Sequence, residues 1–111
     1  MTDKNRNELK GKVMTIGDLV EYQPGTVSSR MVINNSAGSV TVFSFDDGEE
    51  ISEHTAPFDA MVTILEGECS VRLSGEFFLM KAGETIIFPA NEPHAVSAVT
   101  KFKMMLVMIK G

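Results

Sequence analysis

The 111-residue sequence has one cysteine, no tryptophan, one tyrosine and two histidines. The single cysteine, Cys69, excludes an internal disulfide framework and favours a reducing compartment. The sequence also lacks a signal-peptide pattern, and no apolar stretch approaches the roughly 18 residues that cross a membrane as a helix. We therefore expect a cytoplasmic protein that has no membrane partner.

Positive charge is scarce as well. Ten Lys and Arg residues stand against fifteen Asp and Glu residues, which gives a formal net charge of −5, and the sequence has no basic block. Nucleic acid is a poor partner for such a chain. A chain of 111 residues is long enough for one compact domain and too short for two. We expect a flexible polar segment at 1–12 and a single domain at 13–111.

Short runs of β-branched, aliphatic and aromatic residues make up most of the remaining sequence. Cys69, Val71 and Leu73 alternate with polar residues, a period of two that indicates a strand with one buried face. Similar runs predict strands at 40–45, 60–65, 77–80, 85–88, 94–99 and 102–109. Turn residues interrupt the runs about every 8–12 residues, which favours an all-β sandwich or barrel. One short helical turn is expected at 16–21, with Asp18 as a candidate cap.

The predicted strand at 102–109 carries apolar side chains on both faces, and so does the run at 31–33. A strand in a lone two-layer sandwich should show one polar face. A further layer is therefore needed over these strands, and we expect a homodimer interface to supply it. Loops or the N-terminal segment of the same chain are the alternative cover.

Each of the two histidines lies beside turn residues at one end of a predicted strand. His54 lies between Gly48 and Pro57, and His94 follows directly after Pro93. Imidazole is the commonest metal ligand in proteins because its neutral nitrogen donates a lone pair near neutral pH. Two such rings on neighbouring strands would point to one place inside a barrel.

The sequence around these histidines resembles the two motifs of the cupin family. In the first segment, five residues separate Gly48 from His54, and Gly67 follows. In the second segment, five residues separate Gly83 from Pro89, and His94 follows. The resemblance covers about residues 38–109. It implies an all-β, RmlC-like double-stranded β-helix, a jelly-roll barrel of two antiparallel sheets that is often dimeric. It also implies a divalent transition metal held by two His and one Glu of the first motif and one His of the second.

Half of the implied metal ligands are missing from this chain. His54 matches the first His of the family motif and His94 matches the last, but Ala56 stands at the second His and Ala60 at the Glu. Asn91 replaces an inner Gly of the second motif. A stable transition-metal site usually has three or four protein ligands. A divalent metal bound by His54 and His94 would therefore occupy an incomplete site.

These departures favour a binding module over a metal enzyme. Alanines in place of His and Glu leave a drier and more apolar pocket, which suits a small, partly apolar ligand. We predict a small cupin that binds a small molecule in the barrel interior, with His54 and His94 as polar anchors. The other predicted lining residues are Phe58, Val62, Ile64, Val96 and Met104. Two alternatives stay open: a metal-dependent enzyme of oxygenase or isomerase type, and a structural oligomer with a vestigial site.

Two further reactive residue types are predicted to be uninvolved. Cys69 falls on the buried face of its strand, where apolar surroundings raise a thiol pKa and leave the thiol unreactive. Asp59 precedes Ala60 directly, and strand alternation points its carboxylate to the opposite face unless a bulge rotates the strand.

Overall fold

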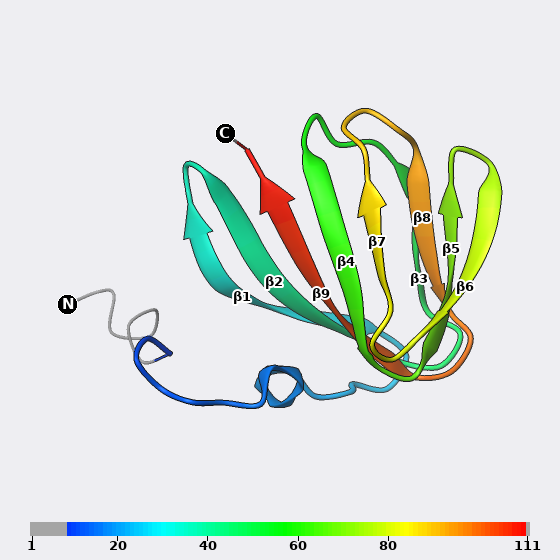
Figure 1. Ribbon diagram of the computed structural model, residues 1–111. Coiled ribbons are helices and arrows are strands. Elements are labelled where there is room, and N and C mark those ends of the chain that lie inside the picture. The colour runs from blue at the N-terminus through cyan, green and yellow to red at the C-terminus, as the bar shows by residue number, and fades with distance from the viewer. Residues whose placement is uncertain (1–8, 111) are drawn as a thin grey trace.

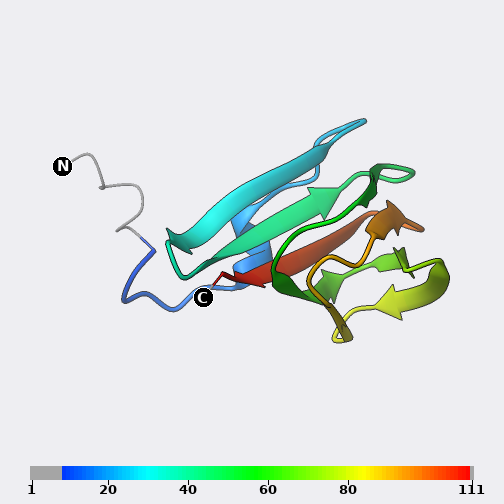
Figure 2. The same ribbon diagram turned by 90° about the horizontal axis from the view of Figure 1, so that it is seen from above.

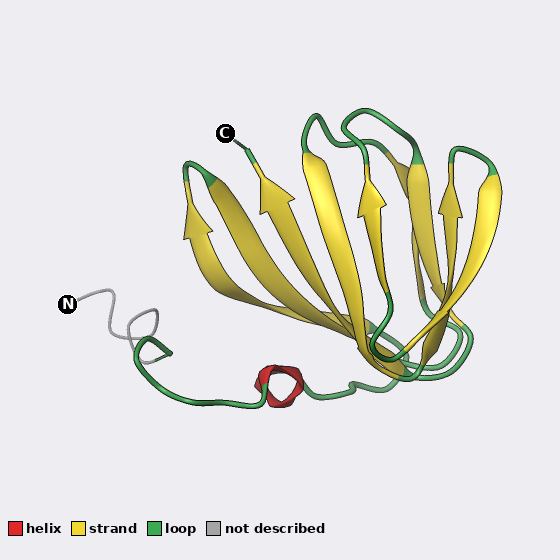
Figure 3. Cartoon of the chain, viewed as in Figure 1, coloured by secondary structure: helices red, strands yellow, loops and turns green. Residues whose placement is uncertain are grey.

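The computed structural model describes residues 9–110, which form a small sandwich of two β-sheets (Figures 1 and 3). These residues contain one 3₁₀ helix, η1 (Ile16–Leu19), and nine strands. The strands are β1 (Val27–Asn35), β2 (Gly38–Phe45), β3 (Glu50–His54), β4 (Asp59–Glu66), β5 (Glu68–Leu73), β6 (Glu76–Lys81), β7 (Thr85–Phe88), β8 (His94–Ala98) and β9 (Phe102–Ile109). Over residues 9–110, no helix has the length and apolar character needed to cross a membrane.

The strands are divided between two antiparallel sheets. The five-stranded sheet has the order β1-β2-β9-β4-β7, and the four-stranded sheet has the order β3-β8-β5-β6. In the view from above, the β1–β2 hairpin lies on the side away from β5 and β6 (Figure 2). The predicted all-β fold of two antiparallel sheets is confirmed.

Strand alternation builds the core between the sheets. On β4, Ala60, Val62 and Ile64 are buried and point inward, whereas the residues between them are more exposed. Phe45 and Phe102, the partners at one end of the β2–β9 pair, stack with ring centroids 4.3 Å apart, and both are fully buried. The aromatic pair therefore fills this end of the sandwich.

The turn between β4 and β5 requires glycine. Gly67 has a φ of 78°, in the left-handed region that glycine adopts without steric cost. A Cβ at this position would collide with the carbonyl oxygen of Lys101 and with Phe102. Because β4 and β5 belong to different sheets, this close approach lets the chain cross between the sheets beside the aromatic pair.

The segment before β1 covers part of the outer face of the five-stranded sheet. The predicted helical turn is present as η1, but its N-cap is Thr15, and Asp18 lies in the first turn instead. Ser44 Oγ donates a hydrogen bond to the carbonyl oxygen of Glu21 at 2.9 Å, and Lys103 Nζ donates one to that of Gly17 at 2.7 Å. Both side chains point outward from their strands, so these bonds fasten the segment over one end of β2 and β9.

The sequence-based prediction missed one strand and part of another. β3 was not predicted because Ile51 is its single apolar residue. β1 extends well beyond the apolar run at 31–33. Residues 1–8 of the predicted flexible segment lie outside the described residues, so the flexibility of 1–12 stays a prediction.

Candidate functional site: a cavity with two histidines

Pairing between β3 and β8 brings the two histidines together. His54 is the last residue of β3 and His94 the first of β8, and the two are direct partners in the antiparallel register. A bulge between Ile51 and His54 shifts the register just before the pair. The ring centroids lie 4.4 Å apart, with the planes inclined at 68°.

Both rings are oriented by the same kind of hydrogen bond. His54 Nδ1 lies 2.9 Å from the carbonyl oxygen of Ser52, and His94 Nδ1 lies 3.0 Å from that of Glu92. A carbonyl oxygen only accepts, so each Nδ1 is the protonated donor. In the neutral ring, Nε2 then carries the free lone pair. The two Nε2 atoms are the chemically available groups of the pair.

His94 is held more firmly than His54. Its residue is 6% exposed, and its ring stacks on Phe88 with centroids 4.3 Å apart and planes inclined at 14°. Burial lowers the pKa of His94 below its ordinary value; the hydrogen bond to Glu92 opposes this shift, and nearby His54 adds to it. His94 is therefore neutral at pH 7. His54 is exposed, which places it at the solvent side of the pair.

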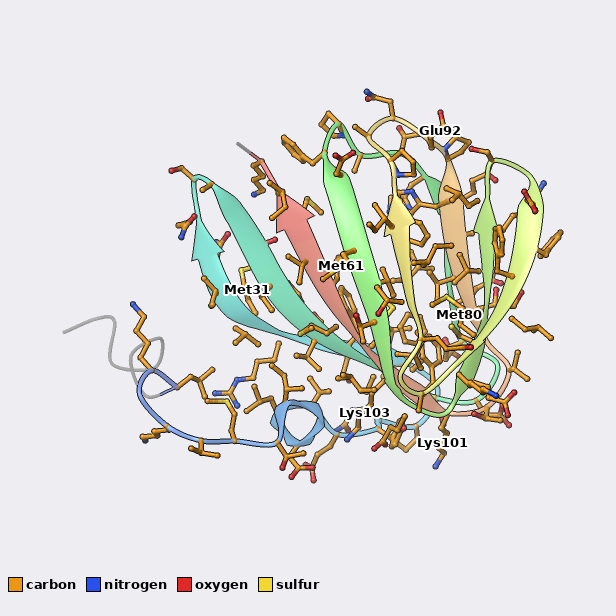
Figure 4. All side chains as sticks on the ribbon, viewed as in Figure 1. Met31, Met61, Met80, Glu92, Lys101 and Lys103 are labelled. Carbon is orange, nitrogen blue, oxygen red and sulfur yellow. The ribbon has the colours of Figure 1, made fainter. Side chains whose placement is uncertain are left out.

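A cavity of about 110 Å³ lies against the two rings inside the sandwich. Its walls are apolar apart from the imidazoles, and they come from both sheets. The lining residues are Phe43, Ile51, His54, Ala56, Ala60, Val62, Phe88, His94, Val96, Met104, Leu106 and Met108. The labelled Glu92 marks this end of the molecule in Figure 4.

Five of the seven residues predicted to form the pocket lie on this lining: His54, His94, Val62, Val96 and Met104. The other two lie elsewhere. Ile64 is 1% exposed and belongs to the packed core near the aromatic pair. Phe58 precedes β4, and Lys110 Nζ lies 5.9 Å from its ring centroid. Phe58 thus lies in the loop before β4 and is not among the residues that line this cavity.

Two of the lining residues that were missed, Leu106 and Met108, could have been found from strand alternation alone. Leu106 and Met108 follow Met104 at intervals of two on β9, so they face the same side of the sheet. Phe88 pairs with Ala60 across β7 and β4 and shares its inward face. Recognising Phe88 required the strand register, which only the structure supplies.

The two alanines at the motif positions make the space. Ala56 and Ala60 both line the cavity, at the positions where the resemblance implies a His and a Glu. A methyl group replaces a long polar side chain at each position. The substitutions therefore remove both volume and polarity from the same side of the site.

Two loops are tied together beside the cavity. The amide of Asn91 donates to the carbonyl oxygen of Ala56 at 2.7 Å, and the amide of Ala90 donates to Asp59 Oδ1 at 2.9 Å. Asn91 has a φ of 68°, a conformation that asparagine tolerates better than most residues other than glycine. Asparagine thus preserves the turn at a position where the resembling motif has glycine.

The sequence matches the cupin domain family over residues 41–110, more than half of the chain. The chain belongs to the cupin family. A comparison with curated proteins finds no match.

Solved structures agree with this assignment. A conserved protein of unknown function from Streptococcus pyogenes is 39% identical to this cupin, with a TM-score of 0.86 over 91% of this chain and 89% of that chain. A cupin superfamily protein from Desulfitobacterium hafniense is 24% identical, with a TM-score of 0.87 over 92% and 94% of the two chains. A cupin 2 conserved barrel domain protein from Leptotrichia buccalis is 40% identical over 84% of this chain and 45% of its own, with a TM-score of 0.81.

The donor set of this cupin does not fit a three-ligand metal centre. Within residues 9–110, no group of three or more His, Cys, Asp or Glu side chains is placed to hold a metal ion. The nearest carboxylates in sequence have other partners: Asp59 accepts from a backbone amide, Glu53 lies 3.8 Å from an arginine Nε, and Glu92 accepts from a serine hydroxyl. His54 and His94 supply two ligands, whereas catalytic zinc sites, for example, have three.

Cys69 lies outside the lining of the cavity and is buried. Its side chain is fully buried in the core on β5, and burial raises the pKa of the thiol to about 12. The thiolate is the nucleophilic form of cysteine. The prediction that this residue packs in the core is confirmed.

Proposed function

We propose that this cupin binds a small, partly apolar molecule in the barrel interior, with His54 and His94 as its polar anchors. One observation carries the proposal: two imidazoles with fixed Nδ1 atoms stand at an otherwise apolar cavity of about 110 Å³. A concave apolar site with a few convergent polar groups is the usual form of a small-molecule pocket.

The chemistry of the walls limits the ligand. Neutral Nε2 atoms accept hydrogen bonds, so the ligand should carry a hydroxyl, an N–H or an acid proton at one end. An engineered apolar cavity of about 150 Å³ is known to bind benzene. The cavity of about 110 Å³ therefore suits a small ring or a short branched chain. Any larger part of the ligand would extend past His54, which is exposed.

Binding without turnover is favoured by the groups around the cavity. The only cysteine is a buried thiol with a raised pKa, and the side chains that line the cavity include no Ser, Thr, Asp or Glu. Nucleophilic catalysis needs an activated nucleophile beside a base. A single free, buried cysteine is also consistent with a reducing compartment such as the cytoplasm.

The second candidate is a metal-dependent enzyme of oxygenase or isomerase type. The observation in its favour is that both Nδ1 atoms bond to backbone carbonyls, as those of metal-binding histidines commonly do. Such a centre would need ligands beyond His54 and His94, because these two do not complete a catalytic site.

The two candidates are separated by elemental analysis and binding measurements on protein purified without added metal. Phenol is a suitable probe because it combines a ring with a hydroxyl donor. We expect no stoichiometric metal, and phenol binding by calorimetry that weakens up to about tenfold in His54→Ala and in His94→Ala. Leu79→Ala, an exposed residue on the four-stranded sheet, is the matched control and should bind like the wild type.

Three results would change this conclusion. Near-stoichiometric metal in the wild type that disappears in His54→Ala would support the enzyme. Phenol binding that is equal in all four proteins would show that the histidines are not anchors. If the protein contains no metal and binds neither phenol nor related small alcohols and acids, the remaining alternative is a structural oligomer with a vestigial site.

A further inference from the structure

The two sheets have four edge strands, and β6 is the least protected of them. β1 and β7 are the edges of the five-stranded sheet, and β3 and β6 are those of the four-stranded sheet. β1 has a bulge and carries Arg30, β3 has a bulge and carries Glu50 and Glu53, and β7 has only four residues. Bulges, charged side chains and short length are the usual protections of an edge. β6 pairs with β5 without a bulge, and its Phe77 and Leu79 are 69% and 77% exposed.

The backbone of β6 is unpaired along the side that faces away from β5. The amide of Lys81 donates to Glu84 Oε1 at 2.9 Å, and the carbonyl oxygen of Lys81 accepts from the amide of Glu84 at 3.0 Å. Both backbone groups of Lys81 therefore point away from β5. Because residues of an antiparallel strand alternate between its two sides, the N–H and C=O groups of Phe77 and Leu79 point the same way. Among residues 9–110, no strand pairs with this side of β6, which leaves donors and acceptors for one more strand.

A groove lies between β6 and β7, beside the free backbone. It has a volume of about 480 Å³ and is continued by a depression of about 240 Å³ that shares Leu79, Met80 and Glu84 with it. The labelled Met80 marks its place in Figure 4. The residues of this β6–β7 groove are Glu68, Phe78, Leu79, Met80, Lys81, Glu84, Thr85 and Ile86. None of them lines the cavity with the two histidines, so the two sites are separate.

The charges along the β6–β7 groove are mainly negative. Glu68 and Glu84 line it and Glu76 begins β6, whereas Lys81 is the one cation in its lining. No ion pair within the described part of the chain neutralises these glutamates. An acidic surface attracts basic partners and repels acidic ones. A second copy of β6 would bring the same glutamates with it, whereas a basic segment would neutralise them.

We propose that the free side of β6 binds an extended segment of a partner polypeptide in which lysine or arginine alternates with aliphatic residues. Addition of a strand to a sheet edge pairs the backbone groups of both chains, and side-chain pockets supply the specificity. Alternation sends the aliphatic side chains of the segment to one face, where they cover Phe78 and Met80 at the groove. Its basic side chains lie on the opposite face, beside Leu79, and are attracted by the glutamates of this edge.

The test uses the full chain and the synthetic peptide acetyl-Lys-Val-Lys-Val-Lys-Val-amide, with binding followed by nuclear magnetic resonance of the backbone amides. We expect saturable binding with a Kd below about 1 mM and signal shifts concentrated in β6, β7 and the turn between them. Leu79→Lys places an ammonium beside the basic side chains of the peptide and should weaken binding about tenfold or more. Ile33→Lys, at an exposed aliphatic residue of the edge strand β1, is the matched control and should bind like the wild type.

Altered peptides separate strand addition from simple charge attraction. Methylation of the valine nitrogens in one peptide and of the lysine nitrogens in another removes the backbone donors of each side in turn, so one of the two should bind at least about tenfold more weakly. The peptide acetyl-Glu-Val-Glu-Val-Glu-Val-amide reverses the charge and should also bind at least about tenfold more weakly. Far-ultraviolet circular dichroism checks that both protein variants are folded.

Several results would overturn the proposal. These are no binding of the lysine–valine peptide at about 1 mM, equal affinity for the acidic peptide, full affinity for both methylated peptides, and unchanged affinity in folded Leu79→Lys. Sedimentation velocity of the protein alone gives a further check. Self-association of the wild type that disappears in Leu79→Lys but persists in Ile33→Lys would assign this edge to a second copy of the chain instead.

Discussion

The barrel interior near Phe45 and Phe102 differs from the interior near His54 and His94. At the first end, two stacked phenylalanines and large aliphatic side chains fill the space between the sheets. At the second end, Ala56 and Ala60 face a cavity of about 110 Å³. The labelled Lys101 and Lys103 mark the filled end in Figure 4, and Glu92 marks the hollow end.

The difference comes from side-chain size, because the backbone alternation is the same at both ends. On β4, Ile64 points into the filled end and Ala60 points into the hollow end. The two residues are four positions apart, so the period-two alternation places both on the inward face. Protein interiors are normally close-packed. At roughly 24 cal/mol per Å³, an unfilled cavity of this size lowers the free energy of unfolding by at most about 3 kcal/mol. The hollow end therefore stabilises the fold less than a filled interior would.

The largest effect is expected from emptying the filled end. Phe45→Ala removes a fully buried ring from the aromatic stack and should lower the free energy of unfolding by about 3–5 kcal/mol. Urea denaturation measures this change. Phe77→Ala, at a residue that is 69% exposed, is the control and should change stability by less than about 0.5 kcal/mol. Equal effects of the two substitutions would contradict the contrast between core and surface.

The next effect is expected from filling the hollow end. Ala60→Leu should occupy the cavity and weaken phenol binding about 100-fold, while the free energy of unfolding changes by less than about 1.5 kcal/mol. Ala98→Leu introduces the same side chain at an inward position packed against the filled core. It should cost about 1–3 kcal/mol by overpacking and leave phenol binding unchanged. Calorimetry measures phenol binding and urea denaturation measures stability in both variants. Phenol binding that is unchanged in Ala60→Leu would show that the cavity is not the binding site.

The smallest effect is expected from pH. Burial lowers the pKa of His94 in the folded state, so the unfolded state takes up its proton first as the pH falls. The contribution of neutral His94 to stability is present above the unfolded pKa of about 6.5 and is lost as the pH falls through the folded pKa. The slope should stay below about 1.4 kcal/mol per pH unit, the limit for one proton. Urea midpoints between pH 7.5 and pH 5 measure it, and a slope that persists in His94→Gln would assign it to other groups.

The sequence predicted the fold better than the site. Most strands were predicted from short runs of β-branched, aliphatic and aromatic residues bounded by turn residues, a pattern that is local to the strand. β3 was missed because its residues are polar, and it becomes a strand through its pairing with β8. Within the site, Val62, Val96 and Met104 were named from the sequence and line the cavity, whereas the stacking of Phe88 on His94 depends on contacts between different sheets.

The sequence by itself determined an all-β fold with two histidines at motif spacings and alanines at two implied ligand positions. These features depend on residue identity and on the period-two geometry of a single strand. Only the tertiary structure decided that the imidazoles meet edge to face, that both Nδ1 atoms bind carbonyls, and that one end of the barrel is hollow. These properties depend on strand register and on packing between distant segments, which no local pattern encodes.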